Sequence, residues 1–241
     1  MKLHHSIFIS LILAGATPAW GSLQSPPAPA TQSAAMARSE HASQRKESVS
    51  KLLVIGDSMT GWIGERLAAY GQKNGFEVAT IVWDGSTIKK WGANEAKIKK
   101  YVDQIDPDAV MVCLGLNESA EKNPQSQLGA SYSAIMKAIG DLPVVWIGPP
   151  EWPGKNYGEP LNGWLATKMG DGAYFESLDL PLPRQSATNP HPSREGIAKW
   201  VDALMQWMPG NAAFQLPGYE KPSVPHTRGK TFIYRKMKDP L

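Results

Sequence analysis

The sequence predicts an α/β fold in which a parallel sheet is covered by helices on both faces. Short apolar runs alternate with segments of helical spacing along most of the chain. The apolar runs are hydrophobic throughout, which is typical of strands that are buried on both faces. Apolar residues make up 42% of the 241 residues, which is enough for a substantial core.

The first strand–helix unit illustrates the pattern. Residues 52–55 (LLVI) form a short apolar run that ends at Gly56, as expected for a buried strand. Apolar residues then recur at helical spacing, so we expect a helix over 62–73, and Asn74-Gly75 stops it.

The remaining elements follow in the same alternation. Strands are expected at residues 76–83, 109–114 and 143–147 and, more weakly, at 173–178. Helices are expected at residues 94–102, 126–139, 164–169 and 194–208. Sheets of this kind carry their functional sites at the carboxyl ends of the strands.

The N-terminal end of the chain has the pattern of an export signal. Residues 1–21 combine a basic start, an apolar run and small residues before a cleavage point at Ser22, as signal peptides do. The apolar run is shorter than the ~20 residues of a membrane span. An uncleaved anchor is the alternative.

Composition divides the rest of the chain into three parts. Residues 22–50 are rich in Ser, Ala, Pro and Gln and are expected to be a disordered linker. The folded domain is expected at 51–208. A Pro-rich, basic extension follows at 209–241, which either wraps the domain or stays loose.

Composition also argues against several classes of protein. The net charge of +3 is small for a nucleic-acid binder. The single cysteine, Cys113, cannot form an intrachain disulfide. The few His residues and Cys113 are not at metal-ligand spacing, and there is no Gly-rich phosphate loop, so we expect neither a metal nor a cofactor.

Chemically useful residues follow three of the expected strands. Ser58 lies in a strand-to-helix turn, where free backbone N–H groups and the helix dipole favour negative charge. Gly85 follows the second strand, and a glycine there lets a backbone N–H approach a substrate closely. Asn117 follows the third strand, and its amide can donate to a developing oxyanion. His191 precedes the last helix and is suited to accept a proton near neutral pH.

The order GDS, Gly, GxN and HP resembles the sequence blocks of the SGNH/GDSL hydrolase family of esterases and lipases, over residues 52–208. The resemblance implies a flavodoxin-like three-layer α/β/α sandwich and the hydrolysis of acyl esters. It implies that Ser58 is the nucleophile and His191 its base. It also implies oxyanion donors at the backbone N–H groups of Ser58 and Gly85 and at the side chain of Asn117.

One position departs from the family pattern. The family usually has Asp three residues before the His, and this chain has Thr188 there. Thr188 could orient His191 by accepting a hydrogen bond, but it brings no charge to stabilise the imidazolium. The site would then work as a Ser–His dyad, use an acid from elsewhere, or be weak. Glu118 also stands where the family often has Asp.

Simpler interpretations exist for some of these residues. Ser58 could be a helix N-cap, and Asp57 could bond backbone groups of its turn. Trp62, Trp83 and Trp91 flank the expected site loops, so they would either stack on a sugar or belong to the core.

Together these features predict a periplasmic or secreted serine esterase that removes small acyl groups, such as acetyl, from an ester substrate. An O-acylated polysaccharide of the cell envelope or the extracellular space is the expected substrate, because such polymers are the abundant acylated material outside the cytoplasm. No nucleic-acid partner is expected, and no stable membrane span after cleavage. Lipids, small esters and acyl transfer stay open.

The alternative is a non-catalytic or acyltransferase SGNH-like module that binds a glycan during cell-envelope assembly. Thr188 and the basic C-terminal extension favour this alternative.

Overall fold

The computed structural model describes residues 49–234, and the expected signal peptide and nearly all of the expected linker lie outside this range. Six strands form one sheet in the order β5-β4-β3-β1-β2-β6, and every pairing is parallel. The strands are β1 (Lys51–Gly56), β2 (Glu77–Trp83), β3 (Ala109–Cys113), β4 (Val144–Ile147), β5 (Tyr174–Phe175) and β6 (Lys230–Tyr234).

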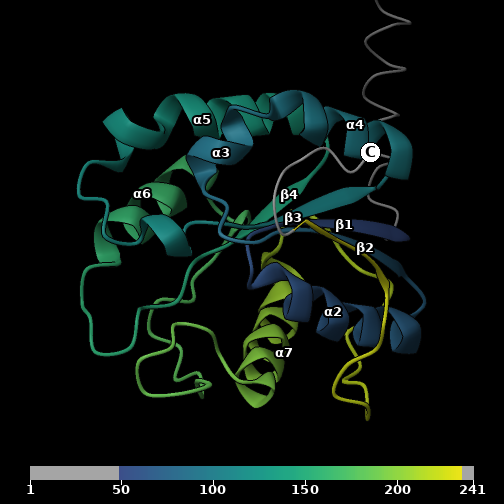
Figure 1. Ribbon diagram of the computed structural model, residues 1–241. Coiled ribbons are helices and arrows are strands. Elements are labelled where there is room, and N and C mark those ends of the chain that lie inside the picture. The colour runs from purple at the N-terminus through teal and green to yellow at the C-terminus, as the bar shows by residue number, and fades with distance from the viewer. Residues whose placement is uncertain (1–48, 235–241) are drawn as a thin grey trace, which may run out of the picture. The chain divides into compact units, whose positions relative to one another are not determined.

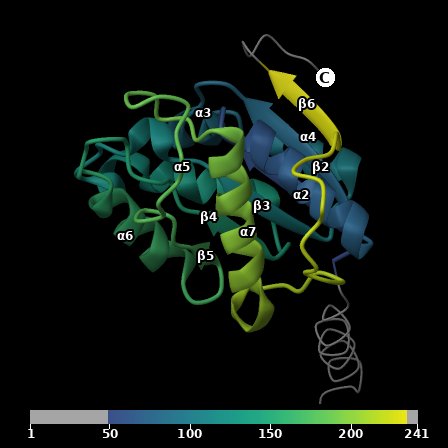
Figure 2. The ribbon, with the colours of Figure 1, turned by 90° about the horizontal axis from the view of Figure 1, so that it is seen from below.

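The helices cover the two faces of this sheet. They are α2 (Thr60–Asn74), α3 (Ile88–Gly92), α4 (Glu95–Ile105), α5 (Pro124–Ile139), α6 (Glu159–Met169) and α7 (Arg194–Asn211). In Figure 1, α3, α4 and α5 lie on one side of the sheet, and α2 and α7 lie on the other. Figure 2 shows α7 and α2 beside one another on their face. The predicted three-layer α/β/α sandwich is therefore confirmed.

The topology brings the loops after β1, β2 and β3 together at the carboxyl ends of the strands. β1 lies between β2 and β3, with Gly56 level with both Val82 and Cys113. The order from β2 through β1 and β3 to β5 is that of flavodoxin-like sheets, whose switch point lies between β1 and β3. Ligand sites in such sheets form at the carboxyl ends of the strands on either side of the switch point.

Two apolar cores, one on each face of the sheet, explain why the strand sequences are hydrophobic throughout. Alternate residues of β1 point to opposite faces, so Leu52 packs in the core under α2 and α7 and Leu53 packs in the core under α4 and α5. Trp200 of α7 is a large fully buried member of the first core, and Trp146 of β4 is one of the second. Burial of both faces thus fixes the sheet between its two layers of helices.

Residues after α7 return along α2 and add a strand that the sequence did not predict. Arg66 of α2 donates to the carbonyl oxygens of Val224 (2.6 Å) and Pro225 (3.2 Å), and it pairs with Asp202 of α7 (2.6 Å). These contacts hold residues 224–225 against α2, and the chain then continues to β6, which pairs with β2 as the outermost strand of the sheet. The segment KTFIY is short and lies in a basic, Pro-rich stretch, so its pattern alone did not indicate a strand.

The start of the domain is slightly earlier than the composition indicated. Val49 is buried, and its N–H donates to the carbonyl oxygen of Gln215 (2.9 Å). The backbone N–H of Ser50 donates to Asp108 (2.8 Å). The composition places both residues in the linker, but their backbone N–H groups bond to the domain, Val49 to a carbonyl oxygen and Ser50 to a side-chain carboxylate. Among the described residues, no helix combines the length and the apolar character needed to cross a membrane.

Candidate active site

Ser58 lies in the tight turn between β1 and α2. The backbone N–H of Asp57 donates to the carbonyl oxygen of Cys113 (3.2 Å), and the Asp57 carboxylate accepts from the Met59 N–H (3.0 Å). Gly56 permits this close approach, because a Cβ there would lie 2.0 Å from the carbonyl oxygen of Cys113. The strand, the turn and the first turn of α2 therefore fix the backbone of Ser58.

His191 lies within hydrogen-bond distance of Ser58, with 2.9 Å between Oγ and Nε2. The loop that carries it turns back on itself before α7. The Gln185 N–H donates to the carbonyl oxygen of His191 (3.1 Å), and the Ser193 N–H donates to that of Pro183 (2.7 Å). These bonds bring the imidazole to the carboxyl end of β1, as a general base for Ser58 requires.

The second ring nitrogen of His191 contacts Asn189. The Asn189 Oδ1 lies 2.9 Å from Nδ1, and it also accepts the backbone N–H of His191 at 2.9 Å. A backbone N–H only donates, so the amide atom facing it must be the oxygen, and Nδ1 must carry a proton to bond the same oxygen. Nε2 is then unprotonated and can accept the proton of the Ser58 hydroxyl, which is the tautomer that a general base needs.

The residue that orients His191 is therefore Asn189 and not Thr188, which is exposed to solvent. The expectation assumed a spacing of three residues. The loop uses a spacing of two, because an Asn side chain readily bonds the backbone N–H two residues further on. The Asn189 Nδ2 also donates to Gln185 Oε1 (3.1 Å), which helps to hold the amide plane. The sequence Asn-Pro-His contained this signal.

The surroundings of His191 favour its neutral form. Burial lowers the pKa of His191, the Asp84 carboxylate opposes this effect, and the positive charge of Arg184 adds to it. Arg184 is a fixed part of the loop, since its guanidinium donates to the carbonyl oxygens of Pro190 and, at 2.7 Å, Glu151. His191 is thus ready to accept a proton at neutral pH.

The expected oxyanion donors lie on the loops that follow β2 and β3. The Asn117 Nδ2 donates to the carbonyl oxygen of Ser86 (2.7 Å), which ties the two loops together and leaves its second amide hydrogen available. Gly85 has a φ of +64°, and a Cβ there would meet nothing within 4 Å, so the space beside it is open. The backbone N–H groups of Ser58 and Gly85 have no acceptor within residues 49–234. Donors are therefore free at the ends of two adjacent strands.

Two buried carboxyl groups lie beneath these loops. Burial raises the pKa of Asp57 to about 7, and the nearby carboxylates of Glu118 and Asp84 add to the shift. Burial also raises the pKa of Glu118 to about 7, against the opposing effect of backbone N–H groups that include that of Lys89. The Glu118 Oε1 accepts the Lys89 N–H (3.3 Å), so Glu118 fastens the loop that carries Gly85.

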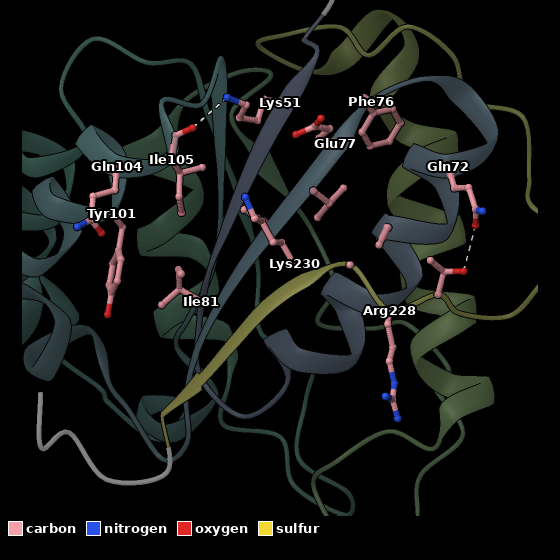
Figure 3. A pocket seen from close by; sticks show the side chains of 15 residues that line it. Lys51, Gln72, Phe76, Glu77, Ile81, Tyr101, Gln104, Ile105, Arg228 and Lys230 are labelled. Carbon is pink, nitrogen blue, oxygen red and sulfur yellow. Dashed lines mark hydrogen bonds between the residues drawn. The ribbon is translucent and has the colours of Figure 1, made fainter. Parts of the chain in front are cut away.

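Beside Ser58 and His191 there is a cavity of about 200 Å³. A larger cavity of about 750 Å³ lies at the other end of the sheet, where Lys51, Glu77 and Lys230 begin β1, β2 and β6 (Figure 3). Its lining contains none of Ser58, Gly85, Asn117, Asn189 and His191. Across residues 49–234, no group of three or more His, Cys, Asp or Glu side chains could hold a metal ion.

Comparison with known proteins gives remote structural similarities only. No family model and no curated protein sequence matches the chain significantly. A family 3 carbohydrate esterase of Clostridium thermocellum is 16% identical and has a TM-score of 0.48, with coverage of 66% of this chain and 94% of the other.

Two further solved structures are similarly distant. A protein of the G-D-S-L lipolytic family from Desulfitobacterium hafniense DCB-2 is 16% identical, with a TM-score of 0.47 and coverage of 64% of this chain and 97% of the other. The protein TesA is 18% identical, with a TM-score of 0.45 and coverage of 66% and 96% respectively. Fold alone does not establish an activity, so the functional case depends on the geometry of the site.

Proposed function

We propose that this protein is an exported serine esterase of the SGNH/GDSL type, which removes small acyl groups from an O-acylated substrate. The observation that carries the proposal is the chain of contacts from Ser58 Oγ through His191 to Asn189 Oδ1. A nucleophile bonded to a base, and a base oriented by a third group, is the arrangement that serine hydrolases share across unrelated folds.

The first half of the reaction transfers the acyl group to the enzyme. Ser58 Oγ attacks the ester carbonyl carbon while its proton passes to His191 Nε2. The carbonyl oxygen becomes an oxyanion, which the free donors of Ser58, Gly85 and Asn117 would stabilise. The bond to the alcohol oxygen then breaks, and that oxygen takes the proton from Nε2. The alcohol leaves, and Ser58 remains acylated.

The second half restores the enzyme with the same groups. Water gives a proton to His191 Nε2 as its oxygen attacks the acyl carbon, and the bond to Ser58 Oγ breaks as Oγ recovers that proton. The products are a carboxylic acid and free Ser58. Asn189 holds Nδ1 through both steps but brings no negative charge, so the imidazolium receives less stabilisation here than it would from an Asp.

The location and the substrate class are parts of the same proposal. The signal-peptide pattern of residues 1–21 supports export to the periplasm or beyond. Acylated polysaccharides are the abundant O-acyl compounds outside the cytoplasm, which supports acetyl groups on a cell-envelope or extracellular polymer as the target.

Hydrolysis of p-nitrophenyl acetate, followed with pure protein, tests the activity. We expect turnover that disappears in Ser58→Ala and persists in Ser126→Ala, a control on the exposed surface of α5. A fluorophosphonate should label wild type at Ser58 and fail to label the Ser58→Ala variant. Absence of both turnover and labelling would reject the esterase.

A non-catalytic or acyltransferase module is the second proposal, and the neutral Asn189 in place of an Asp favours it. A transferase would be labelled at Ser58 but would hydrolyse acetyl esters slowly unless a sugar acceptor were added. A non-catalytic module would show neither labelling nor turnover. The same two measurements therefore separate the three functions.

A further inference from the structure

The cavity beside the catalytic pair lies on the side of His191. Its lining consists of Ser58, Met59, Trp62, Gln185, His191, Pro192 and Ile197. None of these residues belongs to the loops that carry Gly85 and Asn117, toward which the oxyanion would point. The alcohol oxygen of an ester must come within reach of His191 Nε2 to receive its proton. An alcohol portion whose oxygen faces Nε2 would therefore extend into this cavity.

Of Trp62, Trp83 and Trp91, which flank the site loops in the sequence, Trp62 alone lines this cavity. Trp83 and Trp91 pack edge to face, with 5.6 Å between their ring centroids, and both are buried. Trp62 is only partly buried and lies in the first turns of α2, immediately after the nucleophile. Its indole is thus available to a ligand, whereas the other two rings belong to the core.

Arg194 holds this indole in place. Its guanidinium lies 4.9 Å from the centre of the Trp62 ring and pairs with Glu65 at 3.2 Å. Arg194 does not line the cavity beside Ser58, but it lines a separate small crevice that Trp62 also borders. The stacked guanidinium therefore supports the ring from outside the cavity and leaves the cavity side open to a ligand.

Gln185 adds hydrogen-bond donors to the same cavity. Its Oε1 accepts from Asn189 and its backbone N–H donates to His191, so the residue is held in place. Its Nε2 has no acceptor among the described residues. Gln185 is exposed, so this amide can bond water in the free protein, and an acyl chain that filled the cavity would displace such water without offering an acceptor. A ring that carries hydroxyl groups would satisfy it.

We propose that this cavity is a sugar subsite for the leaving alcohol, with Trp62 as the stacking surface and Gln185 as a hydroxyl donor. The inference rests on the esterase function proposed above and deepens it. The cavity volume of about 200 Å³ is below the ~300–1,000 Å³ of pockets that enclose a drug-sized ligand. The cavity therefore takes one ring, and the remainder of a polymer would extend into solvent.

Two matched substrate series test this assignment. In the first series, acetate esters of ethanol and of methyl β-glucopyranoside differ only in the alcohol. In the second series, ethyl acetate, butyrate and hexanoate differ only in the acyl chain. The variants are Trp62→Ala, Gln185→Ala and Trp164→Phe, the last as a control for a partly buried indole on α6.

We expect Trp62→Ala to raise the KM for the acetylated glycoside about fivefold to tenfold and to change the ethyl acetate kinetics little. Gln185→Ala should raise the KM for the acetylated glycoside by less, and it should lower kcat on both acetates alike, because it also removes the acceptor that holds the Asn189 amide. Trp164→Phe should behave as wild type. The acyl-chain preference should stay unchanged in all three variants. A Trp62→Ala enzyme that instead gains activity on butyrate or hexanoate would overturn the assignment and make the cavity an acyl pocket.

Binding without turnover separates the subsite from the esterase. Ser58→Ala is titrated with methyl β-glucopyranoside, and saturation-transfer NMR follows the contact of the sugar with the protein. A signal that Trp62→Ala removes in this background supports the subsite even if wild type proves inactive on every ester. No signal in Ser58→Ala, together with unchanged glycoside kinetics in Trp62→Ala, rejects the subsite and leaves the esterase intact.

Discussion

The turn after β1 and the loop before α7 deliver the two reacting groups, but they are held by different kinds of contact. The turn is part of a regular strand–helix unit, and Asp57 within it is only 1% exposed. The loop has almost no regular structure, and Arg184 and Asn189 fasten it through hydrogen bonds to backbone and side-chain groups. Changes in the turn should therefore cost stability, and changes in the loop should cost activity.

The largest expected effect is on stability, from Gly56→Ala in the turn. The added methyl group would lie 2.0 Å from the backbone carbonyl oxygen of Cys113 and 2.2 Å from Thr60 Oγ1, so the strands would have to separate. We expect a loss of about 4 kcal/mol or more in the free energy of unfolding, measured by urea denaturation. Gly163→Ala on the exposed face of α6 is the control, and it should be neutral or slightly stabilising. Wild-type stability in Gly56→Ala would contradict the close packing of the turn.

In the loop, Asn189→Ala should lower activity strongly and stability only slightly. Without Oδ1, the His191 ring loses the contact that fixes its orientation and keeps the proton on Nδ1. We therefore expect kcat to fall by about 100- to 1,000-fold while KM changes little. The free energy of unfolding should drop by only about 1 kcal/mol, because the loop is half exposed. Thr188→Ala is the control and should keep kcat within about twofold of wild type. If Thr188→Ala lost activity and Asn189→Ala retained it, the assignment of the orienting residue would be wrong.

The two regions also differ in how far the sequence predicts them. The strands and helices around Ser58 are predictable, because burial on both faces leaves long apolar runs in β1 and β3. The meeting of Ser58 with His191 was predicted from the resemblance of the GDS and HP blocks to those of the SGNH/GDSL family. Asn189 was missed because the family spacing pointed to Thr188, and the spacing in a loop depends on individual hydrogen bonds. β6 was missed because a single edge strand depends on the partner that pairs with it.

Glu118, beneath the loop that carries Gly85, should make stability depend on pH. Its pKa of about 7 in the folded protein is above the ordinary glutamate value of 4.5, so the folded state binds more protons than the unfolded state between these two pH values. The stability of wild type should therefore fall as pH rises from about 4.5 to about 7. Glu118→Gln should remove about 2 kcal/mol of this fall and also reduce the part due to Asp57, because the Glu118 charge helps to raise the pKa of Asp57.

The measurement for Glu118→Gln is urea denaturation at several pH values. Glu77→Gln, at an exposed position at the start of β2, is the matched control and should keep the slope of wild type. A wild-type slope in Glu118→Gln would mean that Glu118 is ionised throughout this range. The other buried groups would then have to account for the whole pH dependence.

The smallest expected effect is a gain of activity from Asn189→Asp. A carboxylate oxygen at this position can still accept the Nδ1 proton and the backbone N–H of His191. Gln185 can rotate its amide so that Nε2 donates to the second carboxylate oxygen. The new negative charge stabilises the imidazolium that forms during proton transfer, so kcat should rise about tenfold at alkaline pH.

The pH profile separates this electrostatic effect from a change in loop structure. Burial lowers the pKa of His191 in wild type, so the acid limb of kcat/KM should lie below the ordinary range of histidine. The carboxylate in Asn189→Asp should move this limb to higher pH, because it favours the protonated ring. Thr188→Asp places its charge on an exposed side chain that does not contact the ring, so both kcat and the limb should stay near wild type. An unchanged limb in folded Asn189→Asp would show that the Oδ1–Nδ1 contact does not control the charge of His191.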